Sequence, residues 1–389
     1  MLDILARRLF LPVKARVQVV RPPKCGDRRP AVSVVIPCYN YGRYLPQCVN
    51  SALDQEGVRV DVLVIDDASP DGSAEVARQL SAQNPRIRAI CHSENRGHIA
   101  TYNEGLEQVT GDYTVLLSAD DLLTPGCLAR AASLMEAYPS VGLTYGFPVD
   151  FTDSGLPRAR TTAKSWIIWQ GHNWIAHRCK VGQNIIRSPE VVLRTRILRE
   201  IGGYRADLPH AADFELWMRT ATVSDIGYVA GADQAYYRNH ASNMHHSTFD
   251  MVDDFAQRLA SFDAIFSECS RRLEDPASMQ DTAHRALARA ALRQAIRDIA
   301  HRALARNTLS PTIRELSHSA VGDETVSDYT AFALKAWPDA TNLPEWRALD
   351  KLASIREGAP VLSPSLMTRM AIRKLRTRTQ LVRKRMVGV

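Results

Sequence analysis

The chain has 389 residues, of which 45% are hydrophobic and 7% aromatic, enough for one large domain with an additional smaller region. Its formal net charge is +7, but residues 1–30 carry eight Lys or Arg against two Asp, and residues 367–389 carry eight Lys or Arg and no acid. The residues between these ends therefore carry a net charge of −7. Because the basic residues lie at the ends, the charge does not indicate a nucleic-acid groove in the main domain, and we expect no nucleic-acid partner.

Seven scattered cysteines form no CxxC pair. This argues against both a disulfide framework and a zinc site, and it fits a reducing cytosol. No apolar run approaches the roughly 18 residues that are needed to cross a bilayer, and the first residues lack a signal-peptide core. We therefore expect a cytoplasmic protein, soluble or peripheral at the inner face of the plasma membrane.

Residues 1–30 form a basic N-terminal extension, in which apolar residues such as Leu5 and Leu9 are mixed with Arg and Lys. This pattern fits a short amphipathic helix on a membrane surface, and it equally fits a plain surface extension. Pro22, Pro23 and Pro30 then mark a linker into the next region.

Four apolar runs follow, each connected to the next by a segment with helical spacing. The runs are residues 31–36, 60–65, 87–91 and 113–117, and the helical segments are residues 44–53, 73–82 and 100–109. Strands that alternate with helices form parallel sheets through right-handed crossovers. The sequence therefore predicts an α/β fold with a Rossmann-like, mostly parallel sheet flanked by helices, of the nucleotide-binding type.

Polar residues follow each of these strands. The first strand leads to Tyr39 and Asn40, the second to Asp66 and Asp67, the third to Arg96, and the fourth to Asp120 and Asp121. Ligands of open α/β sheets bind at the carboxyl ends of strands. The Asp pair after the fourth strand is either a solvated acidic turn or a site where a divalent cation lies between carboxylates and a phosphate. Four polar endings on one rim favour the metal site.

The pattern continues to about residue 248 with a helix at 128–137, strands at 142–151 and 228–237, and an amphipathic helix that starts near Asp213. Residues 165–181 contain three tryptophans, which form a sugar platform or lid in one interpretation and core in the other. Residues 249–366 show helical spacing and predict a helical C-terminal region. Residues 367–389 predict a basic amphipathic tail that contacts an anionic membrane, contacts an acidic protein, or is disordered.

The order of six stretches resembles the glycosyltransferase family 2 enzymes, an inverting, sugar-nucleotide-dependent group with the GT-A fold. The stretches are residues 32–40 (VSVVIPCYN), 64–69 (VIDDAS), 95–97 (NRG), 118–121 (SADD), 202–204 (GGY) and 212–217 (ADFELW). The resemblance covers about residues 31–245 and implies a GT-A glycosyltransferase domain at 31–248, with the α-helical region as an appendage. No comparable motif occurs in residues 250–389.

The resemblance also implies site residues, position by position. The nucleotide would be bound by Pro37, Tyr39, Asn40, Asp67, Arg96, Asp120 and Arg238, with Tyr39 stacked on the base and Asp67 accepting from the ring N–H of the base. Asp121 would ligate Mn²⁺ or Mg²⁺ bridging the diphosphate. Arg238 and His240 follow the last strand, where some members bring a cation or imidazole to the diphosphate or the metal. Asp213 would be the general base.

Transfer of a sugar from a nucleoside diphosphate requires similar groups, independently of the resemblance. A nucleoside diphosphate that leaves an anomeric carbon gathers negative charge, which a cation held by carboxylates offsets. A single displacement with inversion needs one carboxylate on the opposite side to accept the proton of the acceptor hydroxyl. The resemblance, which this chemistry fits, implies transfer from a UDP- or dTDP-sugar to a hydroxyl of a glycan or lipid-linked acceptor in surface polysaccharide biosynthesis.

Two departures from the family pattern leave alternatives open. Ala212 stands where an acidic residue often precedes the base, and Ala119 stands where many members place a third carboxylate. An inactive or weak GT-A scaffold or carbohydrate-binding module is thus the first alternative, and a sugar-nucleotide nucleotidyltransferase the second, although residues 37–40 are not its Gly-rich phosphate loop. Glu215 is a second choice for the base, or else a solvated helix residue.

Overall fold

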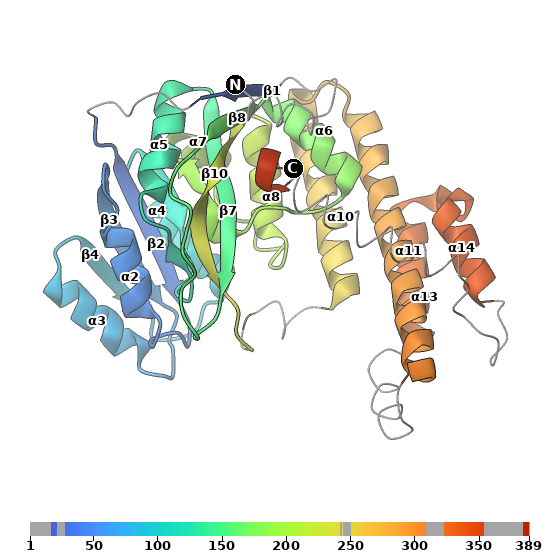
Figure 1. Cartoon of the computed structure of the whole chain (residues 1–389), viewed down its shortest axis with the longest axis horizontal. Coiled ribbons are helices and arrows are strands. Elements are labelled where there is room, and N and C mark those ends of the chain that lie inside the picture. Colours follow the sequence, from blue (N-terminus) through green and yellow to red (C-terminus); the bar gives the residue numbers. More distant parts are fainter. Residues whose placement is uncertain are drawn as a thin grey trace. The chain divides into compact units, whose positions relative to one another are not determined.

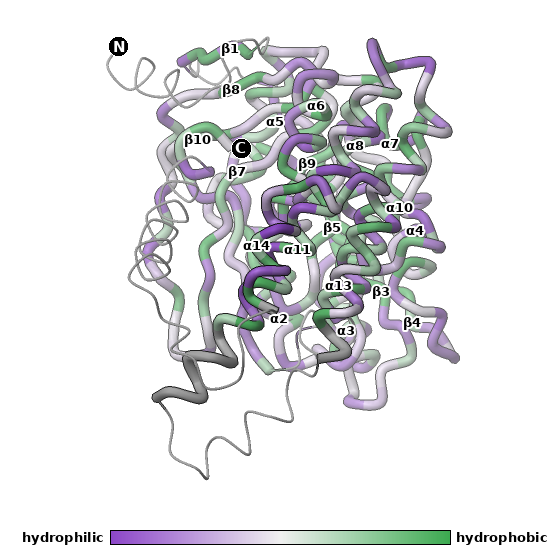
Figure 2. Tube along the Cα trace, turned by 90° about the vertical axis from the view of Figure 1, so that its right-hand side faces the viewer, coloured by the Kyte–Doolittle hydropathy of each residue, from purple (hydrophilic) through white to green (hydrophobic). Residues whose placement is uncertain are grey.

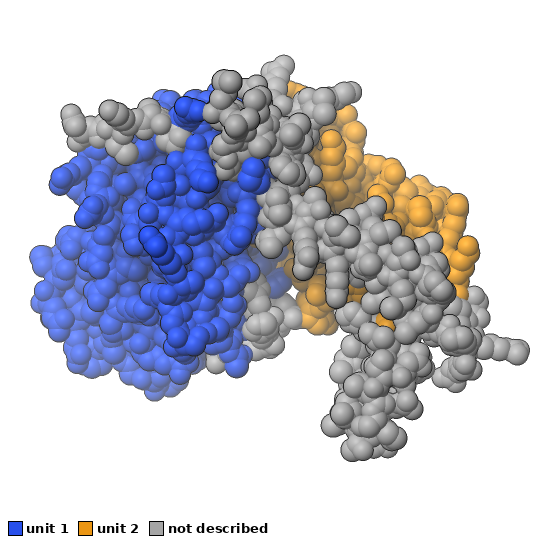
Figure 3. All heavy atoms as spheres, in the orientation of Figure 1, with its two compact units in different colours: residues 1–175, 185–247, 382–389 blue, residues 176–184, 248–381 orange. Residues whose placement is uncertain are grey.

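The structure, a computed structural model, describes residues 17–21, 28–241, 243, 250–308, 323–353 and 384–388. The chain divides into two compact units, which Figure 3 shows in different colours. Unit 1 comprises residues 1–175, 185–247 and 382–389, and unit 2 comprises residues 176–184 and 248–381. The helix predicted for the N-terminal extension and most of the predicted basic tail, residues 367–383, lie outside the described residues.

The centre of unit 1 is a sheet with the strand order β1-β8-β10-β7-β9-β5-β2-β3-β4, to which β6 is added beside β10 (Figure 1). The bounds are β1 Val17–Val20, β2 Ala31–Cys38, β3 Arg59–Asp66, β4 Ile87–Cys91, β5 Tyr113–Leu116, β6 Leu122–Leu123, β7 Val141–Phe151, β8 Ser165–Trp169, β9 Val192–Arg194 and β10 Asp225–Arg238. Strands β2 to β5 pair in parallel, as do β7 and β10, and β9 joins the two groups by antiparallel pairing. The predicted α/β class is confirmed.

Helices cover both faces of the parallel strands. Those of unit 1 are α2 Leu45–Leu53, α3 Ser73–Gln83, α4 His98–Glu107, α5 Cys127–Ala137, α7 Thr195–Ile201 and α8 Ala212–Ala221, and α6 Gly171–Val181 crosses from unit 1 into unit 2. Val34 and Ile36 of β2 belong to the main apolar cluster together with Leu45 of α2, whereas Val35 faces α4. The alternation follows from the strand period of two, and Figure 2 shows the hydrophobic residues along the strands in green.

Gly105 allows α4 to lie close to the sheet. A Cβ atom at this position would lie 2.3 Å from Cγ1 of Val35 and 3.1 Å from Cδ1 of Ile65. Real Cβ atoms do not approach other atoms so closely, so any side chain here would displace the helix or the strand. The close approach fixes the position of Tyr102 and Asn103, one turn earlier on α4.

The tryptophan-rich stretch is core. Residues 165–169 form β8, and residues 171–181 form α6. Trp166, Trp169 and Trp174 are at most 2% exposed. The interpretation as a sugar platform or lid is therefore wrong for these three side chains, because none of the rings reaches the surface.

Unit 2 is helical in its described residues. It contains α10 Met251–Glu268, α11 Pro276–Thr308, α13 Asp323–Ala336 and α14 Pro344–Ala353. Asp250 caps α10 by accepting the N–H groups of Val252 and Asp253, and the Phe255 ring stacks on Phe332 with 5.5 Å between centroids. None of the described helices has the length and hydropathy of a membrane span.

We predict that Gly105→Ala destabilises unit 1, although Gly→Ala inside a helix normally stabilises by roughly 1 kcal/mol. The reason is the contact with Val35. Val35→Ala alone should cost roughly 2 kcal/mol through the cavity it leaves, and the double variant should be less destabilised than the sum of the two changes, with a coupling energy of roughly 1 kcal/mol. Urea unfolding of the four proteins measures this coupling, and strict additivity would contradict the packing described.

Candidate active site

The Asp120–Asp121 pair lies in a tight turn directly after β5. The N–H of Asp121 donates to the carbonyl of Ser118 at 3.0 Å, and the two residues are 5% and 2% exposed. Burial raises the pKa of Asp120, and burial together with the charge of Asp120 raises the pKa of Asp121 well above its ordinary value. The pair is therefore not a solvated acidic turn, and its two carboxylates repel each other in a buried place.

Arg238, the last residue of β10, holds this turn in place. Its backbone N–H donates to Oδ1 of Asp121 at 2.9 Å, and its Nε donates to the carbonyl of Asp120 at 2.8 Å. The other guanidinium nitrogens donate to Asp153 at 2.5 Å and Gln47 at 2.8 Å. The guanidinium also lies over the rings of Tyr44 and Phe151. Arg238 thus positions the carboxylates, and the nucleotide contact that the resemblance implies for it stays a prediction.

His240 lies beside the same pair. Its Nε2 is 3.0 Å from Oδ2 of Asp120, and its ring packs at 5.4 Å from Tyr41 and 5.5 Å from Tyr44. The structure therefore brings Asp120, Asp121, Arg238 and His240 together, and the contact of His240 with a metal stays a prediction.

Asp67 holds the loop that contains Arg96. Its Oδ1 accepts the N–H of Arg96 at 2.9 Å and lies 2.8 Å from Nδ1 of His92, and its Oδ2 accepts the N–H of Gly97 at 3.0 Å. Burial alone would raise the pKa of Asp67, but these hydrogen bonds outweigh it and lower the pKa. Both carboxylate oxygens thus bind the protein itself, a positioning role that sequence reasoning missed.

The residues predicted to contact the base lie at the ends of β2 and β3. Tyr39 is 47% exposed, an uncommon exposure for a large aromatic residue, and Pro37 is the residue before the last of β2. Asn40 (φ 62°) and Ala68 (φ 56°) are in left-handed conformations, and the N–H of Asn40 donates to Oγ of Ser69 at 3.0 Å. Arg96 is half-exposed and pairs with Glu104 at 3.1 Å.

Asp213 is the second residue of α8, and two glycines before the helix set its position. Gly202 (φ 84°) ends α7, and Gly203 lies so close to Asn103 that a Cβ would be 2.2 Å from the Oδ1 of that residue. Asn103 accepts the N–H of Tyr204 at 2.7 Å and donates to its carbonyl at 2.8 Å. The GGY stretch lies between α7 and α8 in the chain, and these hydrogen bonds hold it against α4.

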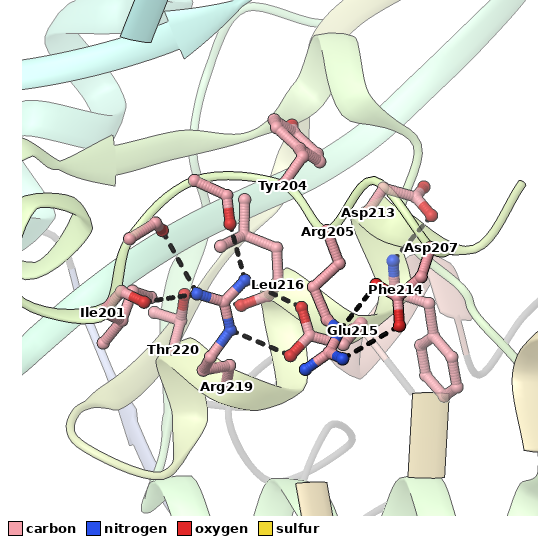
Figure 4. A network of polar contacts seen from close by, with 12 residues as sticks. Ile201, Tyr204, Arg205, Asp207, Asp213, Phe214, Glu215, Leu216, Arg219 and Thr220 are labelled. Atoms are coloured by element: carbon pink, nitrogen blue, oxygen red, sulfur yellow. Dashed lines mark hydrogen bonds and ion pairs between the residues drawn. The ribbon is translucent and has the colours of Figure 1, made fainter. Parts of the chain in front are cut away.

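Glu215 is a structural residue. It is 1% exposed and forms two hydrogen bonds of 2.8 Å with Arg219. Figure 4 shows that Arg219 also reaches back to the turn before α8, where it donates to the carbonyls of Ile201 and Gly203. Glu215 is thus neither a solvated helix residue nor placed to serve as a base, since its carboxylate is held by Arg219.

The Tyr102 hydroxyl, on α4, feels the charges of both Asp213 and the Asp120–Asp121 pair. Burial and the charges of Asp120, Asp213 and Asp121 all raise the pKa of the Tyr102 hydroxyl, so all three carboxylates lie within electrostatic reach of one phenol. Its ring packs between His98 and Tyr204, each at 5.5 Å. No motif in the sequence pointed to Tyr102, because this role depends on contacts between α4 and three distant segments.

The donor atoms present fit a divalent cation that is shared with a diphosphate. Among the described residues, no three His, Cys, Asp or Glu side chains are grouped closely enough to hold a metal by themselves. Mg²⁺ is commonly bound by one or two carboxylates together with substrate phosphates rather than by an all-protein cage. Two adjacent carboxylates whose pKa values are raised by burial, and for Asp121 also by the charge of Asp120, meet that description, because a cation would offset their repulsion.

Comparison with known proteins agrees with this arrangement. Residues 33–193 match the sequence profile of Glycosyl transferase family 2. An uncharacterized protein of Mycobacterium tuberculosis is 28% identical over 216 residues, which are 52% of this chain and 65% of that protein. An uncharacterized glycosyltransferase of Nostoc sp. is 33% identical over 132 residues, which are 33% of this chain and 41% of the relative. The chain thus matches less than two thirds of either relative.

One solved structure shows the fold. The crystal structure of S. aureus TarS 1–349 in complex with UDP-GlcNAc has a TM-score of 0.54 and 17% sequence identity, covering 83% of each chain. This likeness confirms the predicted GT-A architecture of the sheet and its helices.

We predict that Asp121→Asn stabilises the protein while keeping the hydrogen bond from the Arg238 N–H. A carboxyl whose pKa is raised on folding contributes stability at low pH that is lost as the pH rises through the folded value. At pH 7 the native aspartate therefore costs stability that an amide does not. We expect Asp121→Asn to raise Tm by roughly 3 °C or more at pH 7 and to flatten the loss of stability between pH 4 and 7. Asp54→Asn, at an exposed site, should do neither, and a lowered Tm for Asp121→Asn would contradict the repulsion argument.

Proposed function

Because residues 33–193 form a glycosyl transferase family 2 domain, we propose that this chain moves a sugar from a UDP- or dTDP-sugar to a hydroxyl of a glycan or lipid-linked acceptor, with inversion, in surface polysaccharide biosynthesis. The observation that carries the proposal is the buried Asp120–Asp121 pair held by Arg238, with the charge of a separate carboxylate, Asp213, acting like theirs on the Tyr102 hydroxyl. A metal-side carboxylate pair and one separate carboxylate are the two parts that a single displacement requires.

The nucleotide would lie across the carboxyl ends of β2 and β3. Tyr39 is exposed there and offers a flat face to the base, with Pro37 and Asn40 beside it. Asp67 would act mainly by holding Arg96 and its loop, since both of its oxygens accept hydrogen bonds from that loop. The half-exposed guanidinium of Arg96 would face the phosphate or the base. That S. aureus TarS was crystallised with UDP-GlcNAc supports a uridine nucleotide as the first candidate.

The diphosphate would lie near the Asp120–Asp121 turn. Asp121 and His240 are the residues proposed to hold Mn²⁺ or Mg²⁺, with Asp120 facing the ribose or the sugar. A bound cation would offset the charge that develops on the leaving diphosphate. Arg238 fixes the orientation of both carboxylates through the bonds described above.

Asp213 would accept the proton of the attacking hydroxyl. It projects from the first turn of α8, and its Oδ1 accepts the N–H of Phe214 at 2.6 Å. The Glu215–Arg219 pair and the Asn103–Tyr204 bonds hold this turn rigidly. Rigid placement matters because general-base catalysis requires the carboxylate to lie within hydrogen-bond distance of the proton it removes.

We predict that Asp213→Asn lowers release of nucleoside diphosphate from the sugar nucleotide by roughly 100-fold or more, while UDP affinity stays within about twofold. Water serves as the acceptor in this assay, so no knowledge of the natural acceptor is needed. Asp207→Asn is the matched control and should keep full activity. Asp207 lies in the segment before α8, is exposed, and pairs with Arg205. Unchanged release by Asp213→Asn would remove it as the base.

We predict that Asp121→Ala abolishes the gain in UDP affinity that Mn²⁺ produces in the unmodified chain. Calorimetric titration with UDP, with and without Mn²⁺, measures that gain as a ratio of two Kd values. If the ratio stays the same in the variant, Asp121 does not hold the cation. If the unmodified chain releases no nucleoside diphosphate from any sugar nucleotide, the inactive-scaffold alternative replaces the proposal.

A further inference from the structure

Residues 384–388, here called the docked segment, lie against the sheet of unit 1 although about 145 residues separate them from the end of β10. Figures 1 and 2 both show the C-terminal end of the chain beside β7 and β10. The hydroxyl of Tyr145 donates to the carbonyl of Gly388, and the hydroxyl of Tyr228 donates to the carbonyl of Arg385 at 3.0 Å. Two tyrosines from neighbouring strands thus bind the backbone of the segment. These two hydrogen bonds do not depend on the side chains of the segment.

The side chains of the docked segment fit their surroundings closely. Val387 is fully buried, and the guanidinium of Arg385 lies 4.6 Å from the centre of the Phe147 ring. Gly388 has φ 71°, and a Cβ there would lie 2.5 Å from Cγ of Tyr228. Only glycine satisfies both the left-handed backbone and the close approach. The contact is therefore specific to this sequence and not a loose adhesion.

The charge of the docked segment also complements the surface beneath it. Glu190 is 1% exposed, and its Oε2 has no hydrogen-bond partner among the described residues. Burial raises the pKa of Glu190 to about 8, and the charge of Lys384 is the largest of the effects that oppose this. Lys384 therefore supplies a positive charge that favours a carboxylate which is otherwise costly to bury.

Glu190 connects the docked segment to the candidate active site. Its Oε1 accepts the backbone N–H of Arg187 at 3.1 Å. The Arg187 side chain pairs with Asp150, lies 4.2 Å from the centre of the Tyr237 ring, and exerts its positive charge on Asp121. Tyr237 precedes Arg238, whose N–H binds Asp121. Each step from Lys384 to Asp121 is thus a hydrogen bond, a ring contact or an electrostatic effect of one charge on another.

We propose that the surface formed by Tyr145, Phe147, Tyr228 and Glu190 is a peptide-binding surface for the docked segment, and that its occupation holds Arg187 in position to favour an anionic diphosphate at the Asp120–Asp121 turn. The first part stands without any assumption about catalysis. The second part rests on the proposed function. Arg187 is a positioning residue here, and the docked segment acts through it.

The test compares the full chain with a chain that ends at residue 383. A fluorescently labelled peptide of residues 380–389 should bind the shortened chain, as measured by fluorescence polarisation, and should not bind the full chain, whose surface is occupied. A peptide with Gly388→Ala and a scrambled peptide of the same composition are the controls for shape and for charge, and both should bind at least roughly tenfold more weakly. Equal binding of all three peptides, or no binding of the first, would overturn the docking.

The coupling is tested by UDP affinity in calorimetry. The shortened chain should bind UDP roughly fivefold more weakly, as expected for the loss of about one charge-assisted contact, and a saturating amount of the unlabelled peptide should restore the affinity. Should the shortened chain fail to fold, full-length Gly388→Ala gives the same comparison. Docking without any change in UDP affinity would overturn the coupling alone, and absence of UDP binding by the full chain would overturn the proposed function while leaving the peptide result valid.

Discussion

The fold of the site depends on how the chain tolerates two adjacent buried carboxylates. Asp120 and Asp121 repel each other where water cannot screen them, and an isolated buried charge is expensive. Arg238 of β10 offsets part of this cost, because its backbone N–H binds Asp121 and its guanidinium binds the carbonyl of Asp120. Arg238 lies more than 100 residues later in the sequence. The hydrogen bonds that hold this turn therefore join the two halves of the sheet. Repulsion remains between the two carboxylates, and the cation proposed to bind there would offset it.

The position of the third candidate carboxylate, Asp213, is determined by different means. Asp213 owes its position to backbone geometry at Gly202 and Gly203, to the amide of Asn103, and to the buried Glu215–Arg219 pair. Each of these contacts joins α8 or the turn before it to its neighbours, and α4 is itself fixed on the sheet by Gly105. The two sides of the candidate site are therefore attached to the same rigid sheet, which is how a short distance between groups from different segments can be kept constant.

The sequence predicted the architecture well where one segment determines its own structure. The apolar runs at 31–36 and 60–65 became β2 and β3, and the polar residues after them lie at the strand ends as expected. It failed where a residue depends on a remote partner. Trp166 and Trp169 are core because β10 and β1 flank β8, and Asp67 is engaged because a loop from residue 92 onward folds over it. Tyr102 carries no local signal, and the sequence did not show that Arg238 binds the Asp120–Asp121 turn or that the end of the basic tail binds the sheet, since these partners lie far apart in the sequence. The roles of Asp213 and Asp121 in catalysis stay predictions.

Asn40 and Ala68 are the only residues other than glycine with positive φ in the part of the chain that the structure describes, and they lie next to each other at the ends of β2 and β3. A left-handed backbone costs roughly 1 kcal/mol for a residue with a Cβ, and the chain sustains this cost twice at the edge where a nucleoside would arrive. These loops thus lose their conformational entropy during folding, and a ligand that binds here would not have to order them. Such preorganisation implies that recognition here favours ligands of one fixed shape over ligands that adapt.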